Sequence, residues 1–135
     1  MIEKKEFDLM LGAISDLYLT ASVLILLDNN YVGRFWTMTE AWCSMMTATK
    51  DGIHPTDDAE CRCTIECIGN ASAKYDVPKL KEELGAKTPA QMHTYLSSTD
   101  IIVTNAKDKM ITLPIIANMD KHVKIMLEEM DVLSA

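Results

Sequence analysis

The stretch VLILLDNNYVGRFWTMTEAW, residues 23–42, predicts a strand, a turn and a helix in succession. Residues 22–27, SVLILL, form a continuous apolar run, which is typical of a short β-strand buried on both faces. The Asp28-Asn29-Asn30 sequence that follows has the side chains of a turn. A helix from about residue 34 to residue 47 comes next, and its predicted core stripe is Phe35, Met38, Trp42, Met45 and Met46. This order of strand, turn and helix predicts an α/β protein.

The rest of the chain continues the alternation of strands and helices. Further strands are predicted over residues 61–70 and 100–105, and further helices over residues 3–20, 77–84, 88–96 and 107–131. Thr88, Pro89 and Gln91 have the spacing of a helix N-cap, and Pro114 is expected to open, bend or interrupt the last helix. Residues 50–60, KDGIHPTDDAE, have the turn signals of a loop.

Strands that alternate with helices predict crossover connections and a parallel sheet. We therefore expect an α/β fold with a short parallel sheet of about three strands flanked by helices, in a flavodoxin-like arrangement. The outer strands of so small a sheet present unpaired backbone groups. We expect the chain to dimerise, or to find further strands elsewhere.

Length and composition limit the function classes. A chain of 135 residues predicts one domain over residues 1–135, and 48% apolar residues are enough for a packed core. The net charge of −7, without a cluster of Lys and Arg, argues against nucleic-acid binding. The start MIEKKEF has no signal-peptide core, and the apolar stretch over residues 17–27 is too short to span a membrane. These features predict a cytoplasmic protein without a membrane segment.

Polar side chains gather where the first strand ends. In an open α/β sheet, ligands bind beyond the carboxyl ends of the strands, which is where Asp28, Asn30 and Tyr31 are expected. The N-terminus of the next helix, with Arg34, would face the same crevice and suits an anionic group such as a phosphate. We interpret these four residues as a candidate binding site.

The helix adds an aromatic ring and a carboxylate to this site. Trp36, Glu40 and Cys43 fall on one stripe of the helix, at positions i, i+4 and i+7. Trp36 therefore joins the candidate binding residues, and Glu40 is the candidate reacting group.

An apolar strand followed by Tyr31, Trp36 and, four residues later, Glu40 resembles a TIR (Toll/interleukin-1 receptor-like) domain. The later residues Asp100, Val103, Thr104, Asn105, Asp108, Lys109, Leu113 and Pro114 are similar to a D-x-x-V-T-N-x-x-D-K…L-P pattern of TIR-like domains in large uncharacterised proteins. The resemblance implies a TIR-like fold over about residues 20–131. In TIR domains that hydrolyse NAD the corresponding glutamate is catalytic, so the resemblance implies that role for Glu40.

The resemblance does not extend to the N-terminal elements of the family. The chain has no D-x-F-I-S strand, and the family's first helix, its second strand and its nucleotide-holding loop also lack counterparts; Phe35 and Thr37 replace the Ser and Cys beside the family's Trp. We therefore expect a TIR-like interaction module that is catalytically silent as this chain, has no cofactor, and pairs with a second copy or with another TIR-like domain. The alternative is an NAD(P) glycohydrolase with Glu40 as the catalytic carboxylate and NAD as the substrate.

Glu40 also has a structural interpretation. Thr37-Met38-Thr39-Glu40 matches the capping box S/T-x-x-E, in which the glutamate binds the backbone N–H of the cap residue. If the helix began at Thr37, Glu40 would serve only to cap it.

Three cysteines lie within seven residues. Cys61, Cys63 and Cys67 would point to one face of a regular strand, and His54 precedes them. A zinc site is one interpretation, but structural zinc sites favour C-x₂₋₄-C turns. Free thiols packed against a helix fit the pattern better, and we expect no metal site. Surface or interface positions are expected for His93 and His122.

Overall fold

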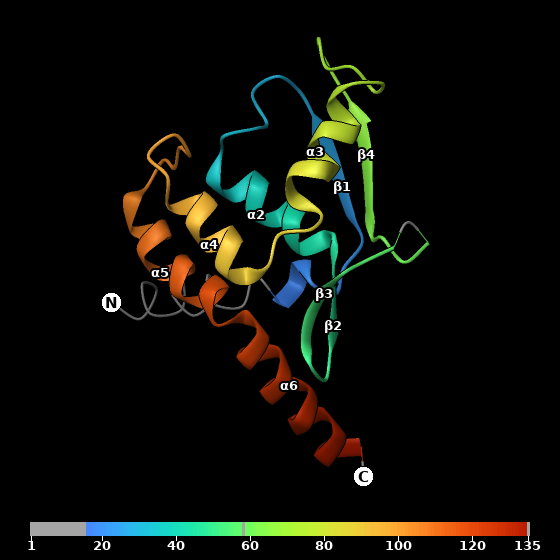
Figure 1. Cartoon of the computed structure of the whole chain (residues 1–135), viewed down its shortest axis with the longest axis vertical. Helices are drawn as coiled ribbons and strands as arrows, with labels where there is room; N and C mark the ends of the chain where they lie inside the picture. Colours follow the sequence, from blue (N-terminus) through green and yellow to red (C-terminus); the bar gives the residue numbers. More distant parts are fainter. Residues whose placement is uncertain (1–15, 58, 135) are drawn as a thin grey trace, which may run out of the picture.

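The computed structural model describes residues 16–57 and 59–134 (Figure 1). Its elements in chain order are β1 (Val23–Leu27), α2 (Phe35–Ser44), β2 (Met46–Thr49), β3 (Gly52–Pro55), β4 (Cys63–Cys67), α3 (Asp76–Leu84), α4 (Pro89–Ser97), α5 (Ala106–Ala117) and α6 (Met119–Ser134). The helix predicted over residues 3–20 lies largely outside the described residues, of which 16–18 are helical. The α/β class is therefore confirmed, with two small sheets and helices around them.

The parallel sheet consists of β1 and β4. Val23 pairs with Cys63 and Leu27 with Cys67, so the two strands are in register along their whole length. The parallel direction confirms the prediction. The expected third strand over residues 100–105 is wrong, because only Ile102 makes a bridge, and it pairs with Arg34 rather than with β1.

A turn explains why residues 100–105 do not extend the sheet. The amide of Ile101 donates to the carbonyl of Ser98 at 3.1 Å. The Lys109 ammonium donates to the same Ser98 carbonyl at 3.0 Å and to that of Ile101 at 2.6 Å. These two carbonyls therefore bind a side chain of α5, and the backbone of Ile102 pairs with Gly33 and Phe35 instead of with β1. The segment instead joins the start of α2 to the start of α5.

The second sheet is an antiparallel hairpin of β2 and β3, which corrects the prediction of a loop over residues 50–60. The expected turn at Asp51-Gly52 is present, but it connects two strands. Gly52 has a φ of +119°, which favours glycine. The next amide, that of Ile53, donates to the Asp120 carboxylate at 2.8 Å, so the hairpin is fixed to α6.

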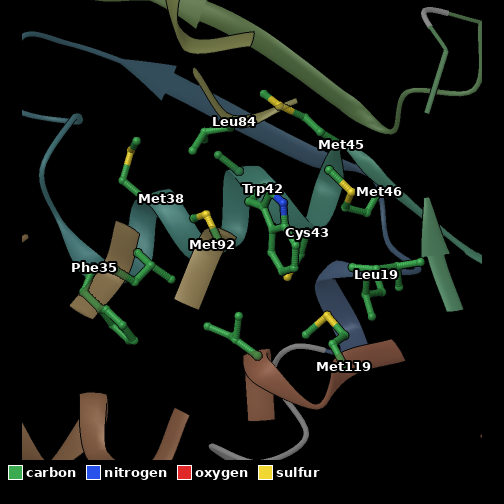
Figure 2. Close-up of a cluster of buried hydrophobic side chains, with 14 of the residues drawn as sticks. Leu19, Phe35, Met38, Trp42, Cys43, Met45, Met46, Leu84, Met92 and Met119 are labelled. Atoms are coloured by element: carbon green, nitrogen blue, oxygen red, sulfur yellow. The ribbon is translucent and has the colours of Figure 1, made fainter. Parts of the chain in front are cut away.

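The core surrounds α2, as the predicted stripe requires. All five stripe residues, Phe35, Met38, Trp42, Met45 and Met46, are buried. Five of the methionines among the described residues belong to this core, and Figure 2 shows Met92 of α4 and Met119 of α6 approaching Trp42 from other elements. These flexible side chains fill the space around the Trp42 ring.

Among the described residues, one face of the parallel sheet is buried and the other is exposed. Ile25 and Leu27 of β1 are buried, whereas the alternate residues Leu24 and Leu26 are 61% and 49% exposed. In Figure 1, α2 and α3 lie on the same side of the sheet. The prediction that this strand is buried on both faces is therefore wrong for the described part of the chain.

The C-terminal half of the chain is helical, as its sequence predicted. Thr88 and Gln91 form the predicted capping box at the start of α4, with both reciprocal hydrogen bonds present. The single helix expected over residues 107–131 is divided into two helices. The first, α5, ends at Ala117, where the side-chain amide of Asn118 donates to the Pro114 carbonyl. No described helix has the length and apolar character needed to cross a membrane.

Candidate functional site

The loop between β1 and α2 is held by its own side chains. The Asp28 carboxylate accepts a hydrogen bond from the Asn30 amide at 2.9 Å, which closes the predicted turn. The Tyr31 hydroxyl donates to the carbonyl of Thr37 at 3.0 Å, and the Thr37 hydroxyl donates to the carbonyl of Tyr31 at 2.8 Å. This reciprocal pair ties the loop to the first turn of α2.

Arg34 and Trp36 lie together at a cavity of about 360 Å³. The cavity is lined by Arg34, Phe35, Trp36, Thr37, Ile102, Val103 and Thr104. The indole N–H of Trp36 donates to the Asp108 carboxylate at 3.1 Å. The cavity therefore lies between the start of α2 and the segment before α5, and it joins two of the predicted binding residues.

Asp28 belongs to a different cavity. It lines a space of about 170 Å³ whose other walls include Asp76, Lys79 and Glu83 of α3. The predicted binding residues are thus not brought together: Arg34 and Trp36 line one cavity, Asp28 lines the other, and Asn30 and Tyr31 line neither. Glu40 is among the lining residues of neither.

Glu40 is half-buried on α2. The helix begins at Phe35 after Arg34 as N-cap, so Thr37 is not a cap residue and the capping-box interpretation of Glu40 is wrong. Burial raises the pKa of the Glu40 carboxyl, and a hydrogen bond with Tyr18 partly offsets that rise. Burial also raises the pKa of Tyr31, with the Glu40 charge as the next cause. Glu40 is therefore a carboxyl group with two tyrosines in its electrostatic surroundings.

The cysteines are free thiols with unequal surroundings. Cys43 is buried, whereas Cys61, Cys63 and Cys67 are half-buried. The described residues contain no group of three or more His, Cys, Asp or Glu side chains that could hold a metal ion. The zinc interpretation of His54 with the three cysteines is therefore not supported. The close approach of the Cys61 and Cys63 thiols was not predicted, although their C-x-C spacing was a signal for it.

The two histidines predicted at surface or interface positions, His93 and His122, lie on α4 and α6. His93 is half-buried on α4. His122 is exposed on α6, where its Nε2 lies 2.7 Å from the Asp16 carboxylate. His122 thus connects α6 to the helical residues that precede β1.

Apolar and polar side chains share the exposed side of the parallel sheet in the described part of the chain. We name it the open sheet face and define it by Leu24, Leu26, Thr64, Glu66 and Ile68, all of which are exposed. Ile68, directly after β4, is 44% exposed. Apolar groups in contiguous exposed positions are a common feature of interaction surfaces.

Comparisons of the chain with protein-family models, with curated proteins and with solved structures gave no match.

Proposed function

We propose that the chain is an interaction module, TIR-like as its sequence predicts, that self-associates through the open sheet face. One observation carries this proposal: a parallel strand, β1, exposes Leu24 and Leu26 to solvent. Parallel sheets in proteins are almost always covered on both faces. A second copy of the chain would supply the missing layer.

The geometry of a pair of sheets supports a two-fold arrangement. Two identical faces can pack against each other around a two-fold axis, so that each residue contacts its counterpart or a reciprocal partner. Stacked sheets lie about 10 Å apart, a distance that leucine side chains from both sides fill. Leu24 and Leu26 would form the centre of such an interface, and the polar residues Thr64 and Glu66 of β4 would lie beside them.

Sedimentation equilibrium of the full chain tests this proposal. Leu26→Lys places a charge on the open sheet face and is expected to raise the dissociation constant at least about tenfold, because every dimer contains the change twice. Met110→Lys is the matched control, since Met110 is 76% exposed on α5, away from the parallel sheet. A monomeric wild type, or equal loss of association in both variants, would refute the proposal.

A second candidate function is NAD(P) glycohydrolysis with Glu40 as the catalytic carboxylate. The observation in its favour is the position of Glu40, half-buried with a pKa raised by burial. A carboxylate in such surroundings stabilises the positive charge that develops on the ribose when the glycosidic bond breaks. Trp36 of the same helix lines a cavity whose walls do not include Glu40, which ranks this function second.

Nicotinamide release from NAD distinguishes the two functions. The interaction-module proposal predicts no release by wild type or by Glu40→Gln at any protein concentration. Release by wild type and not by Glu40→Gln would establish the glycohydrolase instead. Release that increases more steeply than the protein concentration would combine the two, with the active site completed by a second copy.

A further inference from the structure

The thiols of Cys61 and Cys63 are in direct contact. Their Sγ atoms lie 2.9 Å apart, and both residues are free cysteines. Residues i and i+2 of a regular strand have Cα atoms about 6.6 Å apart, at the upper end of disulfide geometry. Cys61 lies two residues before β4 begins, outside the regular strand, and its sulfur is in contact with that of Cys63.

Arg62 fixes the backbone between the two cysteines. Its guanidinium donates four hydrogen bonds, to the carbonyls of Tyr18, Ala21, Cys43 and Met46, at 2.5–3.0 Å. Its own carbonyl accepts from the amide of Val23 at 2.9 Å, next to the β1–β4 ladder. A residue held at both its backbone and its side chain keeps the neighbouring thiols in place.

A cavity of about 330 Å³ gives access to Cys61 from solvent. The other residues of its wall are Met45, Thr56, Asp57, Lys81, Glu82, Gly85 and Ala86. Cys63 is not one of the lining residues, so an incoming molecule meets Cys61 first. The volume is at the lower end of the range for small-molecule sites, about 300–1,000 Å³.

The electrostatic surroundings assign different roles to the two thiols. Although burial acts to raise the pKa of Cys61, hydrogen bonds with Cys63 and Thr56 and the charge of Lys81 lower it overall. Burial and the neighbouring Cys61 raise the pKa of Cys63 to about 11. The thiolate is the attacking form of cysteine, so the accessible residue is also the better nucleophile.

We propose that Cys61 and Cys63 form a redox-active dithiol that reduces low-molecular-weight disulfides entering the cavity beside α3. In the first step the Cys61 thiolate attacks one sulfur of the disulfide, forms a mixed disulfide and releases one thiolate. In the second step Cys63 loses its proton and attacks the Cys61 sulfur, forming the Cys61–Cys63 disulfide and releasing the second thiolate. The two protein thiols lose two electrons, and the substrate disulfide gains them.

The remaining cysteines are excluded from this chemistry by their positions. Cys67 lies four residues beyond Cys63 on β4, about 13 Å away along the strand, which is beyond the reach of a disulfide. Cys43 is buried, and burial raises the pKa of its thiol to about 12. Neither can replace Cys63 as the resolving thiol.

Oxidised glutathione is a suitable probe for the reduced full chain. After exposure, rapid alkylation and peptide mass mapping, wild type is expected to lose two of its four free thiols and to carry a Cys61–Cys63 disulfide. Cys63→Ser is expected to accumulate a glutathione adduct on Cys61. Cys61→Ser is expected to react at least about tenfold more slowly, since it lacks the thiol that lines the cavity.

Cys67→Ser is the matched control, and it is expected to behave as wild type. A second comparison is made with wild type unfolded in urea, which is expected to form the Cys61–Cys63 disulfide more slowly because Arg62 no longer fixes the pair. The proposal is overturned if the folded chain retains both thiols, if Cys67 reacts first, or if unfolding does not slow disulfide formation. Circular dichroism identifies any variant that fails to fold. If a variant fails to fold, the comparison of folded wild type with wild type unfolded in urea decides.

Discussion

The indole N–H of Trp36 donates a hydrogen bond to the carboxylate of Asp108 at 3.1 Å, and this bond joins α2 to α5. The two residues are 72 positions apart in the sequence. A parallel bridge between Arg34 and Ile102 reinforces the same contact. The start of α2, where the sequence predicts a binding site, is therefore also the point at which the C-terminal helices are fixed to the core.

A double-mutant cycle measures the energy of this contact. Trp36→Phe removes the donor and Asp108→Ala removes the acceptor. We expect a coupling free energy of about 1–2 kcal/mol in urea unfolding, because the bond has a charged acceptor and is partly buried. Asp100→Ala, an exposed change on the preceding turn, serves as the control. Additive effects of the two changes would show that the bond contributes nothing to stability.

Arg62 is expected to be essential for stability. Arg62→Met leaves four backbone carbonyls without their shared donor, and we expect the free energy of unfolding to fall by about 3 kcal/mol or more. Arg62→Lys keeps the charge but cannot reach four carbonyls at once, so an intermediate loss is expected. If Arg62→Lys were as stable as wild type in urea unfolding, the charge and not the hydrogen-bond geometry would be responsible.

Glu40 is expected to give a pH dependence of stability. Its pKa is raised in the folded state above the ordinary 4.5, so the folded chain binds its proton more tightly than the unfolded chain does. Its contribution is complete below pH 4.5 and is lost as the pH rises through the folded-state pKa. The free energy of unfolding of wild type minus that of Glu40→Gln should therefore decrease with pH. A difference that is constant or increasing from pH 4 to pH 8 would contradict the raised pKa.

Gly52 is expected to tolerate no side chain. A Cβ at this position would lie 2.5 Å from the Asp120 carboxylate that accepts the Ile53 amide, and the φ of +119° is unfavourable for alanine. We expect Gly52→Ala to lower the free energy of unfolding by about 2–3 kcal/mol. Gly69→Ala is the control, since its φ is +59° and nothing lies within 4 Å; it should cost about 1 kcal/mol. Equal losses would show that the contact with Asp120 is unimportant.

The sequence predicted the elements whose signals are local. The capping box at Thr88 was correct because the residues that form it are within one helical turn. The burial of Phe35, Met38 and Trp42 was correct because one face of α2 determines it. The helix predicted to residue 47 ends at Ser44, and the buried Met46 belongs to β2. The hairpin of β2 and β3 was missed, since the Asp51-Gly52 turn alone does not distinguish a loop from two short strands.

The candidate site depended on contacts between distant residues, which a single sequence does not show. Trp36 was placed correctly at a cavity, but its partner Asp108 depends on the way α5 returns to α2. Thr37 and Glu40 had the spacing of a capping box, but α2 begins at Phe35, two residues before Thr37. The residue before that start, Arg34, forms the bridge with the distant Ile102. The thiol pair at Cys61 depends on Arg62, whose four acceptors come from three segments of the chain.

The most direct test of self-association observes the leucine side chains themselves. A soluble paramagnetic probe broadens the NMR signals of exposed methyl groups, and the broadening of Leu24, Leu26 and Met110 can be followed as the protein concentration is raised. We expect Leu24 and Leu26 to become protected in step with dimer formation, while Met110 stays accessible. If both leucines remain accessible at concentrations where the chain is dimeric, the open sheet face is not the interface.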